Sequence, residues 1–166
     1  MAPETVVSLT GFSTSLDKST DHSTNDVWQK NYKPRVLIVE DNEQNCELME
    51  VYLRNIYQTD KVHSGRQAVK QAFVNQYDVI LMDINLGPDM DGIQATIEIR
   101  KLGNYQTIPI IAVTGFSTED EKTKILSGGL DNLLSKPFTR EELVRIIKKE
   151  SLREKIHVMP KNKNNS

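Results

Sequence analysis

Short runs dominated by aliphatic residues, separated by segments with helical periodicity, constrain the fold of this chain more than any other feature. The clearest runs are residues 35–39, 78–82 and 109–113. Runs that are apolar at nearly every position are typical of parallel strands that are buried on both faces. Residues 59–62 and 132–134 are weaker candidates for strands of the same sheet.

A segment with apolar residues at i, i+3 and i+4 follows each run, as on one face of a helix. Ser64, Ser117 and Thr139 stand at helix-capping positions, and Gly128 with Gly129 suits the end of the fourth helix. The residues expected on the buried faces are Leu48, Val51, Tyr52, Ala68, Val69, Ala72, Phe73, Ile93, Ile97, Ile125, Leu126, Leu143, Ile146 and Ile147.

Five strand–helix units in alternation predict an α/β fold. We expect a doubly wound, five-stranded parallel sheet with helices on both faces, the flavodoxin-like (βα)5 arrangement. In such sheets the ligand site lies beyond the C-terminal ends of the strands. The polar residues found there are Glu40 and Asp41 after the first strand, Asp83 after the third, Thr114 after the fourth and Lys136 after the fifth.

The chemistry of this set points to phosphoryl transfer. Three neighbouring carboxylates repel one another, and a hard divalent cation would neutralise them; Mg²⁺ fits, with Mn²⁺ as the alternative. A carboxylate can be the nucleophile, and phosphoryl transfer depends mainly on positioning and charge neutralisation. Lys136 would supply positive charge and Thr114 a neutral donor. Separately, each residue could be a helix cap or turn residue, but their joint occurrence favours a phosphorylation site at Asp83.

Four motifs, at residues 36–42, 78–83, 111–115 and 135–138, resemble the receiver domain of two-component response regulators. The resemblance covers about residues 34–150. It implies that Asp83 accepts a phosphoryl group from a phosphohistidine on a sensor histidine kinase or a histidine phosphotransfer protein. It also implies a metal site in which Asp41 and Asp83 bind through their side chains and Asn85 through its backbone carbonyl. Glu40 is expected to help hold the metal, often through water.

The resemblance gives the remaining site residues their roles. Lys136 is expected to pair with a phosphoryl oxygen, and its peptide bond to Pro137 is expected to be cis. Thr114 would move toward the phosphoryl group and transmit the signal to the fourth helix, fifth strand and fifth helix, where a downstream protein would bind. Leu133 stands where many relatives have an aromatic residue, so the aromatic version of this switch is not expected here.

Composition sets the remaining expectations. The chain has 166 residues and a formal net charge of −2, which does not favour direct binding to DNA or to a membrane. Its single cysteine, Cys46, is expected to be a small buried hydrophobe in a cytoplasmic protein. The predicted domains are a flexible Ser/Thr-rich tail at 1–33, a receiver domain at 34–152 and a polar, mildly basic tail at 153–166.

Several functions remain open within this interpretation. A haloacid-dehalogenase-type phosphatase is less favoured, because that class needs a second Asp where this chain has Asn85. The full set of site residues argues against a receiver degenerated into a binding module, and the missing glycine fingerprints argue against a nucleotide-binding domain. The favoured function is a switch that catalyses only its own phosphorylation and dephosphorylation, rather than an enzyme. A phosphorelay intermediate or a receiver fragment of a hybrid histidine kinase is the alternative, although Met1 and the tail favour a complete, single-domain protein.

Overall fold

The computed structural model describes residues 32–115 and 118–158, with side chains described up to residue 153. The compact unit that carries the fold begins at Lys33. Nearly all of the predicted tail at 1–33, and the end of the predicted tail at 153–166, lie outside the described residues.

Five parallel strands form a single sheet in the order β2-β1-β3-β4-β5 within the described part of the chain. Each begins and ends within one residue of its predicted bounds, so the predicted five-stranded parallel sheet is confirmed. The central strands are apolar throughout because helices cover both of their faces. The strands are β1 (Arg35–Val39), β2 (Gln58–Val62), β3 (Val79–Met82), β4 (Ile110–Thr114) and β5 (Asn132–Ser135).

The helices alternate with the strands along the chain. The last of them, α6, continues past residue 152, where the sequence predicts the end of the folded domain. Over the described residues, none of the helices has the length and apolar character needed to cross a bilayer. The helices are α2 (Glu43–Leu53), α3 (Gly65–Val74), α4 (Gly92–Arg100), the short 3₁₀ helix η1 (Gly103–Tyr105), α5 (Glu119–Ser127) and α6 (Arg140–Val158).

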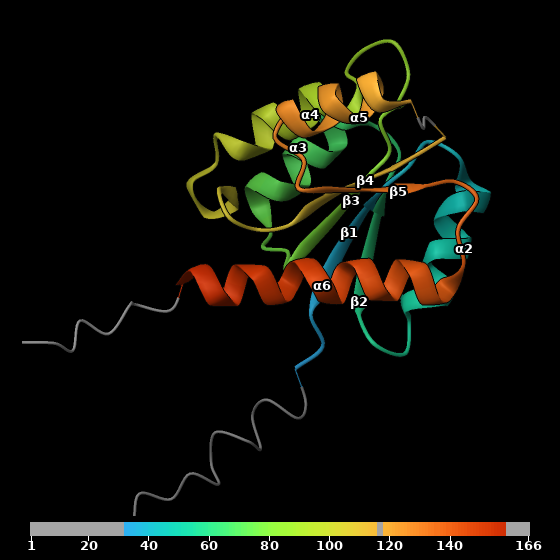
Figure 1. The fold of residues 1–166 in the computed structure, drawn as a ribbon, viewed down its shortest axis with the longest axis vertical. Helices are drawn as coiled ribbons and strands as arrows, with labels where there is room; N and C mark the ends of the chain where they lie inside the picture. Colours follow the sequence, from blue (N-terminus) through green and yellow to red (C-terminus); the bar gives the residue numbers. More distant parts are fainter. Residues whose placement is uncertain (1–31, 116–117, 159–166) are drawn as a thin grey trace, which may run out of the picture. The chain divides into compact units, whose positions relative to one another are not determined.

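Two separate apolar clusters form the core, one on each face of the sheet. The first includes buried residues of α3, α4 and α5, and the second includes buried residues of α2 and α6. Figure 1 shows α3, α4 and α5 together on one side of the sheet and α6 on the other. The predicted placement of helices on both faces of the sheet is therefore confirmed.

The buried faces of several helices differ from the prediction. In α2, Leu48 and Val51 are 42% and 51% exposed, whereas Cys46, Met49 and Leu53 are buried. This helix carries apolar residues on both sides, and packing against the sheet and α6 selects one of them. Other residues predicted as buried are also exposed, namely Phe73, Ile97 and Leu126, while Ala68, Ala72, Ile125, Leu143 and Ile147 are buried as predicted.

Helix caps were predicted with mixed success. The hydroxyl of Ser64 accepts a hydrogen bond from the Gln67 backbone N–H, as its spacing predicts. Helix α5 begins one residue later than the sequence predicts, because its cap is Thr118; the predicted cap, Ser117, lies outside the described residues. Gly129 follows this helix with φ +93°, a left-handed conformation that glycine adopts without steric cost.

Cys46 is fully buried against the sheet, as predicted, and its burial raises the pKa of the thiol to about 11. At pH 8 the thiolate fraction is then about a hundredfold below that of an ordinary cysteine. We expect the folded protein to react with a thiol reagent such as dithionitrobenzoate at least about a hundredfold more slowly than the urea-unfolded protein. Equal rates for the two states would contradict this placement.

Candidate functional site

The C-terminal ends of β1 and β3 lie side by side, and the acidic residues of the site directly follow these two strands. The backbone N–H of Asp83 donates to the carbonyl of Val39 at 2.9 Å, so the two strand ends are fixed against each other. Glu40 is fixed from the other side, because its backbone N–H donates to the carbonyl of Val62 at 3.1 Å. These backbone hydrogen bonds therefore fix the main-chain positions of Glu40 and Asp83.

Three carboxylates form a cluster at this edge. One oxygen from each of Glu40, Asp41 and Asp83 lies within 4.8 Å of the others. Glu40 is 1% exposed and Asp83 is 5% exposed, whereas Asp41 faces solvent. Two buried anions and one accessible anion, all offering oxygen, form a donor set that suits a hard divalent cation.

Lys136 joins this cluster from the end of β5. Its ammonium Nζ lies 2.5 Å from Glu40 Oε2 and 2.6 Å from Asp83 Oδ2. Burial lowers the pKa of Lys136, but hydrogen bonds and charges from Asp83 and Glu40 outweigh this effect, so its pKa lies above the ordinary value. Burial raises the pKa of Glu40, and hydrogen bonds from Asn45 and Lys136 act against that rise. One positive charge thus compensates two buried carboxylates.

Asp83 is held on both oxygens. The backbone N–H of Asn85 donates to Oδ1 at 3.0 Å, while Lys136 contacts Oδ2. A carboxylate with both oxygens fixed is oriented before any substrate arrives, which lowers the entropic cost of a reaction at that group. The role of the Asn85 carbonyl as a metal ligand remains a prediction.

Gly92, at the start of α4, makes this arrangement possible by its lack of a side chain. A Cβ at this position would overlap with the carbonyl oxygen of Asp83 and would lie 2.9 Å from Cα of Ile84. Because both are backbone atoms of the segment that carries Asp83, the overlap could be relieved only by moving the site itself.

We expect Gly92→Ala to lower the free energy of unfolding by about 2 kcal/mol, the usual scale for overpacking. Urea unfolding followed by circular dichroism would measure this. Gly103→Ala is the matched control, because no atom lies within 4 Å of a Cβ built at Gly103. Equal midpoints and slopes for both variants would show that the close approach at Gly92 is not required.

Thr114 ends β4, the strand next to β3. Its side chain is fully buried, and its backbone carbonyl accepts a hydrogen bond from the Lys136 N–H at 2.8 Å. The register places Thr114 two residues beyond Ala112, the partner of Met82, and Asp83 directly follows Met82. The peptide bond between Lys136 and Pro137 is cis. The predicted site residues therefore come from neighbouring strands, and their individual roles remain predictions.

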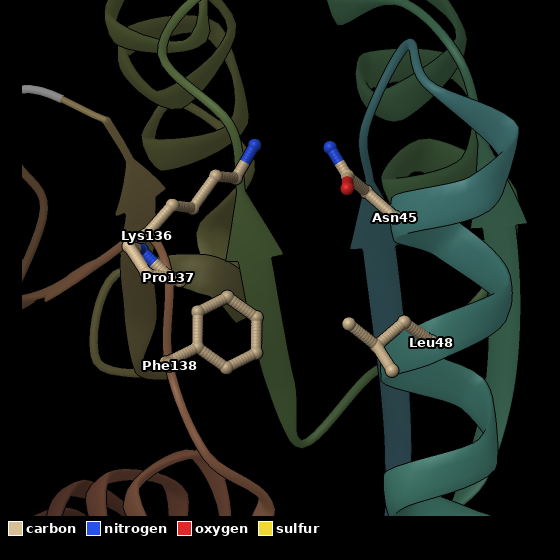
Figure 2. Close-up of a pocket in the computed structure, with 5 residues that line it drawn as sticks. All are labelled: Asn45, Leu48, Lys136, Pro137 and Phe138. Atoms are coloured by element: carbon tan, nitrogen blue, oxygen red, sulfur yellow. The ribbon is translucent and has the colours of Figure 1, made fainter.

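A pocket of about 300 Å³ lies beside this cluster, between α2 and the segment after β5. Figure 2 shows Leu48 and Phe138 facing each other across its lower part, with Asn45 and Lys136 at the upper end. Because Lys136 contacts both Glu40 and Asp83, the pocket adjoins the acidic cluster directly.

Two residues that contribute to this site were not predicted from the sequence. Asn42 caps α2, its side chain accepting from the Asn45 backbone N–H at 3.1 Å. The side-chain amide of Asn45 donates to Glu40 Oε1 at 2.7 Å. The available signal was an Asn at the cap position followed by a second Asn in the first helical turn, directly after the two acids.

Comparisons with known proteins agree with this geometry. The family model for the response regulator receiver domain matches residues 36–148. Histidine-protein kinase BarA of Escherichia coli is 39% identical over 113 residues, which cover 68% of this chain and 12% of BarA. Cell cycle transcriptional regulator CtrA of Caulobacter vibrioides is 35% identical over 129 residues, which cover 74% of this chain and 52% of CtrA.

A solved structure gives the same result. The receiver domain of sensor histidine kinase PA1611 from Pseudomonas aeruginosa, with a magnesium ion coordinated in its active-site cleft, superposes with a TM-score of 0.67. It is 40% identical to this chain and covers 72% of it and 98% of its own length. The chain spans only a small part of BarA and about half of CtrA. It nevertheless carries a receiver domain of two-component signalling and belongs to the response regulator receiver domain family.

Proposed function

We propose that Asp83 is the phosphoacceptor of this receiver. An Asp83 carboxylate oxygen attacks the phosphorus of a phosphohistidine; the P–N bond breaks, a P–O bond forms, and the electron pair stays on the histidine nitrogen. The observation that carries this proposal is the pair of contacts that orient Asp83, from Lys136 Nζ at 2.6 Å and from the Asn85 N–H at 3.0 Å. An anchored, nearly buried carboxylate beside a cation has the properties that such a nucleophile needs.

The acidic cluster is the proposed cation site. Side chains of Glu40, Asp41 and Asp83, with the backbone carbonyl of Asn85, would hold Mg²⁺, and Mn²⁺ offers the same preference for oxygen. The cluster's close carboxylate oxygens support this assignment, as does the magnesium ion described for the PA1611 receiver. The cation would neutralise charge on the phosphoryl oxygens.

Lys136 and Thr114 complete the proposed site. The ammonium of Lys136 lies 2.6 Å from Asp83 Oδ2 and would contact a phosphoryl oxygen once Asp83 is modified. The hydroxyl of Thr114, at the end of the neighbouring strand, would donate to another phosphoryl oxygen. Both residues would stabilise charge without forming a covalent bond, which is the main contribution of protein groups to phosphoryl transfer.

The protein would act as a switch rather than as a turnover enzyme. We propose that it catalyses its own phosphorylation and dephosphorylation, and that the modified state changes contacts with other proteins. A phosphatase of the haloacid-dehalogenase type would need a carboxyl general acid two residues after the nucleophile, and the amide of Asn85 cannot serve as one.

The proposed partners follow from this chemistry. The donor is a sensor histidine kinase or a histidine phosphotransfer protein, and the downstream target binds the face formed by α5, β5 and α6. We keep residues 34–152 as the receiver domain and residues 1–33 and 153–166 as tails. A cytoplasmic location is proposed because the free thiol of Cys46 suits a reducing compartment.

A second function deserves a test because the chain spans 12% of the length of BarA. The receiver could pass its phosphoryl group to another histidine, as a relay intermediate or as part of a hybrid kinase. A pull-down that compares the protein loaded with beryllium fluoride and Mg²⁺ with the free protein would separate the two functions. A partner that carries a phosphorylatable histidine and binds only the loaded form favours the relay, because a phosphoryl donor must bind the unmodified form. A loaded-form partner without such a histidine favours a direct output.

The direct test of the main proposal is phosphoryl incorporation from acetyl phosphate. We expect one phosphoryl group per chain in the presence of Mg²⁺, and none after removal of the metal with EDTA. Incorporation that is independent of the metal, or the absence of any incorporation into folded protein with Mg²⁺, would argue against it.

A further inference from the structure

We propose that Asn45 is a positioning residue that holds the carboxylate of Glu40 in place for the divalent cation. This inference rests on the proposed function, because it assigns a further residue to the same cation site. Asn45 belongs to neither the acidic cluster nor the strand ends, and its role is visible only in the folded structure.

The geometry fixes Asn45 from two directions. Its backbone N–H donates to the side chain of the cap residue Asn42 at 3.1 Å, which anchors the first turn of α2. Its side-chain amide then donates to Glu40 Oε1 at 2.7 Å. Because Glu40 is 1% exposed, water has little access to this carboxylate, and protein donors must satisfy it.

The two oxygens of Glu40 have different partners. Asn45 contacts Oε1, and Lys136 contacts Oε2 at 2.5 Å. In Figure 2 the side-chain nitrogens of Asn45 and Lys136 both point into the gap at the upper end of the pocket, where these hydrogen bonds place the Glu40 carboxylate between them. The carboxylate is thus oriented from both sides.

These two partners differ in what they do when a cation or a phosphoryl group arrives. Lys136 is positively charged and would repel a divalent cation, and it also contacts Asp83, so phosphorylation would draw it away from Glu40. Asn45 is neutral and donates to Oε1, the oxygen of Glu40 that Lys136 does not contact, so neither the charge of a cation nor a movement of Lys136 opposes this hydrogen bond. It is therefore the donor that can orient Glu40 while the cation is bound.

The electrostatics of Glu40 agree with this role. Burial raises the pKa of its carboxyl group, and the hydrogen bonds from Asn45 and Lys136, together with the charge of Lys136, act in the opposite direction. Asn45 thus favours the ionised form of a buried acid without adding a charge of its own. Partners of this kind, which orient a metal ligand through a hydrogen bond, commonly contribute tenfold or more to metal affinity.

The test is Mg²⁺ titration of the full-length chain by calorimetry, which measures cation binding without any phosphoryl donor. We expect Asn45→Leu, which keeps the volume but removes the donor, to bind Mg²⁺ about tenfold more weakly than wild type. Asn45→Gln keeps an amide donor and should recover part of the affinity. Gln44→Leu makes the same type of change at an exposed neighbouring position and should bind like wild type.

A double-variant cycle tests whether Asn45 affects Mg²⁺ affinity through Glu40. In a Glu40→Gln background, Asn45→Leu should change Mg²⁺ affinity less than twofold, because the carboxylate that it orients is absent. A full tenfold loss in that background would show that Asn45 acts elsewhere and would overturn the proposal. Asn45→Ala replaces Asn45→Leu in the cycle if the leucine variant does not fold.

The outcomes separate this inference from the proposed function. Wild-type protein that binds no Mg²⁺ would refute the cation site itself. Wild type that binds Mg²⁺, with Asn45→Leu binding equally well, would refute only the role of Asn45. A lower melting temperature for Asn45→Leu with unchanged Mg²⁺ affinity would assign Asn45 a purely structural role and also overturns the inference.

Discussion

Substitution of Asp83 by Asn is expected to abolish phosphoryl incorporation from acetyl phosphate and Mg²⁺. The amide has nearly the shape of the carboxylate and can still accept the hydrogen bond from the Asn85 N–H, so the fold should be retained. An amide, however, is not a nucleophile that forms an acyl phosphate, and it offers the cation one charge fewer. Intact-protein mass spectrometry at acidic pH would measure the loss.

Asp89→Asn is the matched control for this experiment. It makes the same chemical change in the loop that follows β3, at a position that is exposed to solvent. We expect it to incorporate phosphate like wild type, while beryllium fluoride with Mg²⁺ should stabilise wild type and Asp89→Asn but not Asp83→Asn. Undiminished labelling of folded Asp83→Asn would remove Asp83 from the role of acceptor.

Substitution of Lys136 by Met is expected to slow phosphorylation about a hundredfold while Mg²⁺ still binds. The substitution keeps most of the aliphatic chain but removes the ammonium that contacts Asp83 Oδ2 and Glu40 Oε2. The phosphoryl oxygens would lose one preorganised positive donor, and the loss of a single such donor commonly lowers a rate by about two orders of magnitude. The initial rate of labelling from acetyl phosphate at saturating Mg²⁺ measures this effect.

The same substitution tests the charge balance of the site. Without a cation, Lys136→Met removes the positive partner of two buried carboxylates. We expect this to lower the free energy of unfolding by about 3 kcal/mol, the usual scale for breaking a buried ion pair. Mg²⁺ should restore more stability to this variant than to wild type. Lys101→Met, on the exposed end of α4, is the control. A labelling rate equal to wild type in folded Lys136→Met would contradict the proposed role of Lys136.

The strands could be predicted almost to the residue, whereas the helix faces could not. A strand such as β3 is apolar throughout because it is covered on both sides, and the run itself carries that information. In α2, Leu48 and Val51 form one apolar set and Met49 and Leu53 another. Periodicity alone gives both sets equal weight, and only contact with the sheet and α6 buries the second.

In the candidate site, too, some residues could be predicted from the sequence and others could not. Glu40, Asp83 and Lys136 could be predicted because each directly follows a strand of the sheet. The C-terminal ends of parallel strands lie at one edge, so residues that follow different strands come close together in space. Gly92 could not be predicted, because its contribution depends on how closely the start of α4 approaches the end of β3, and packing sets that distance. Asn45 was not predicted either: two Asn residues follow the acids in the sequence, but only the folded geometry shows that the second one donates to Glu40.

The most direct measurement of the central claim is the position of the acyl phosphate in the wild-type chain. Protein phosphorylated from acetyl phosphate with Mg²⁺ would be reduced with borohydride, which converts a phosphorylated aspartate to homoserine, and then mapped by peptide mass spectrometry. We predict conversion at Asp83 alone, with Asp41 and Asp89 unchanged. Conversion at another residue, or labelled protein in which Asp83 is never converted, would contradict the account.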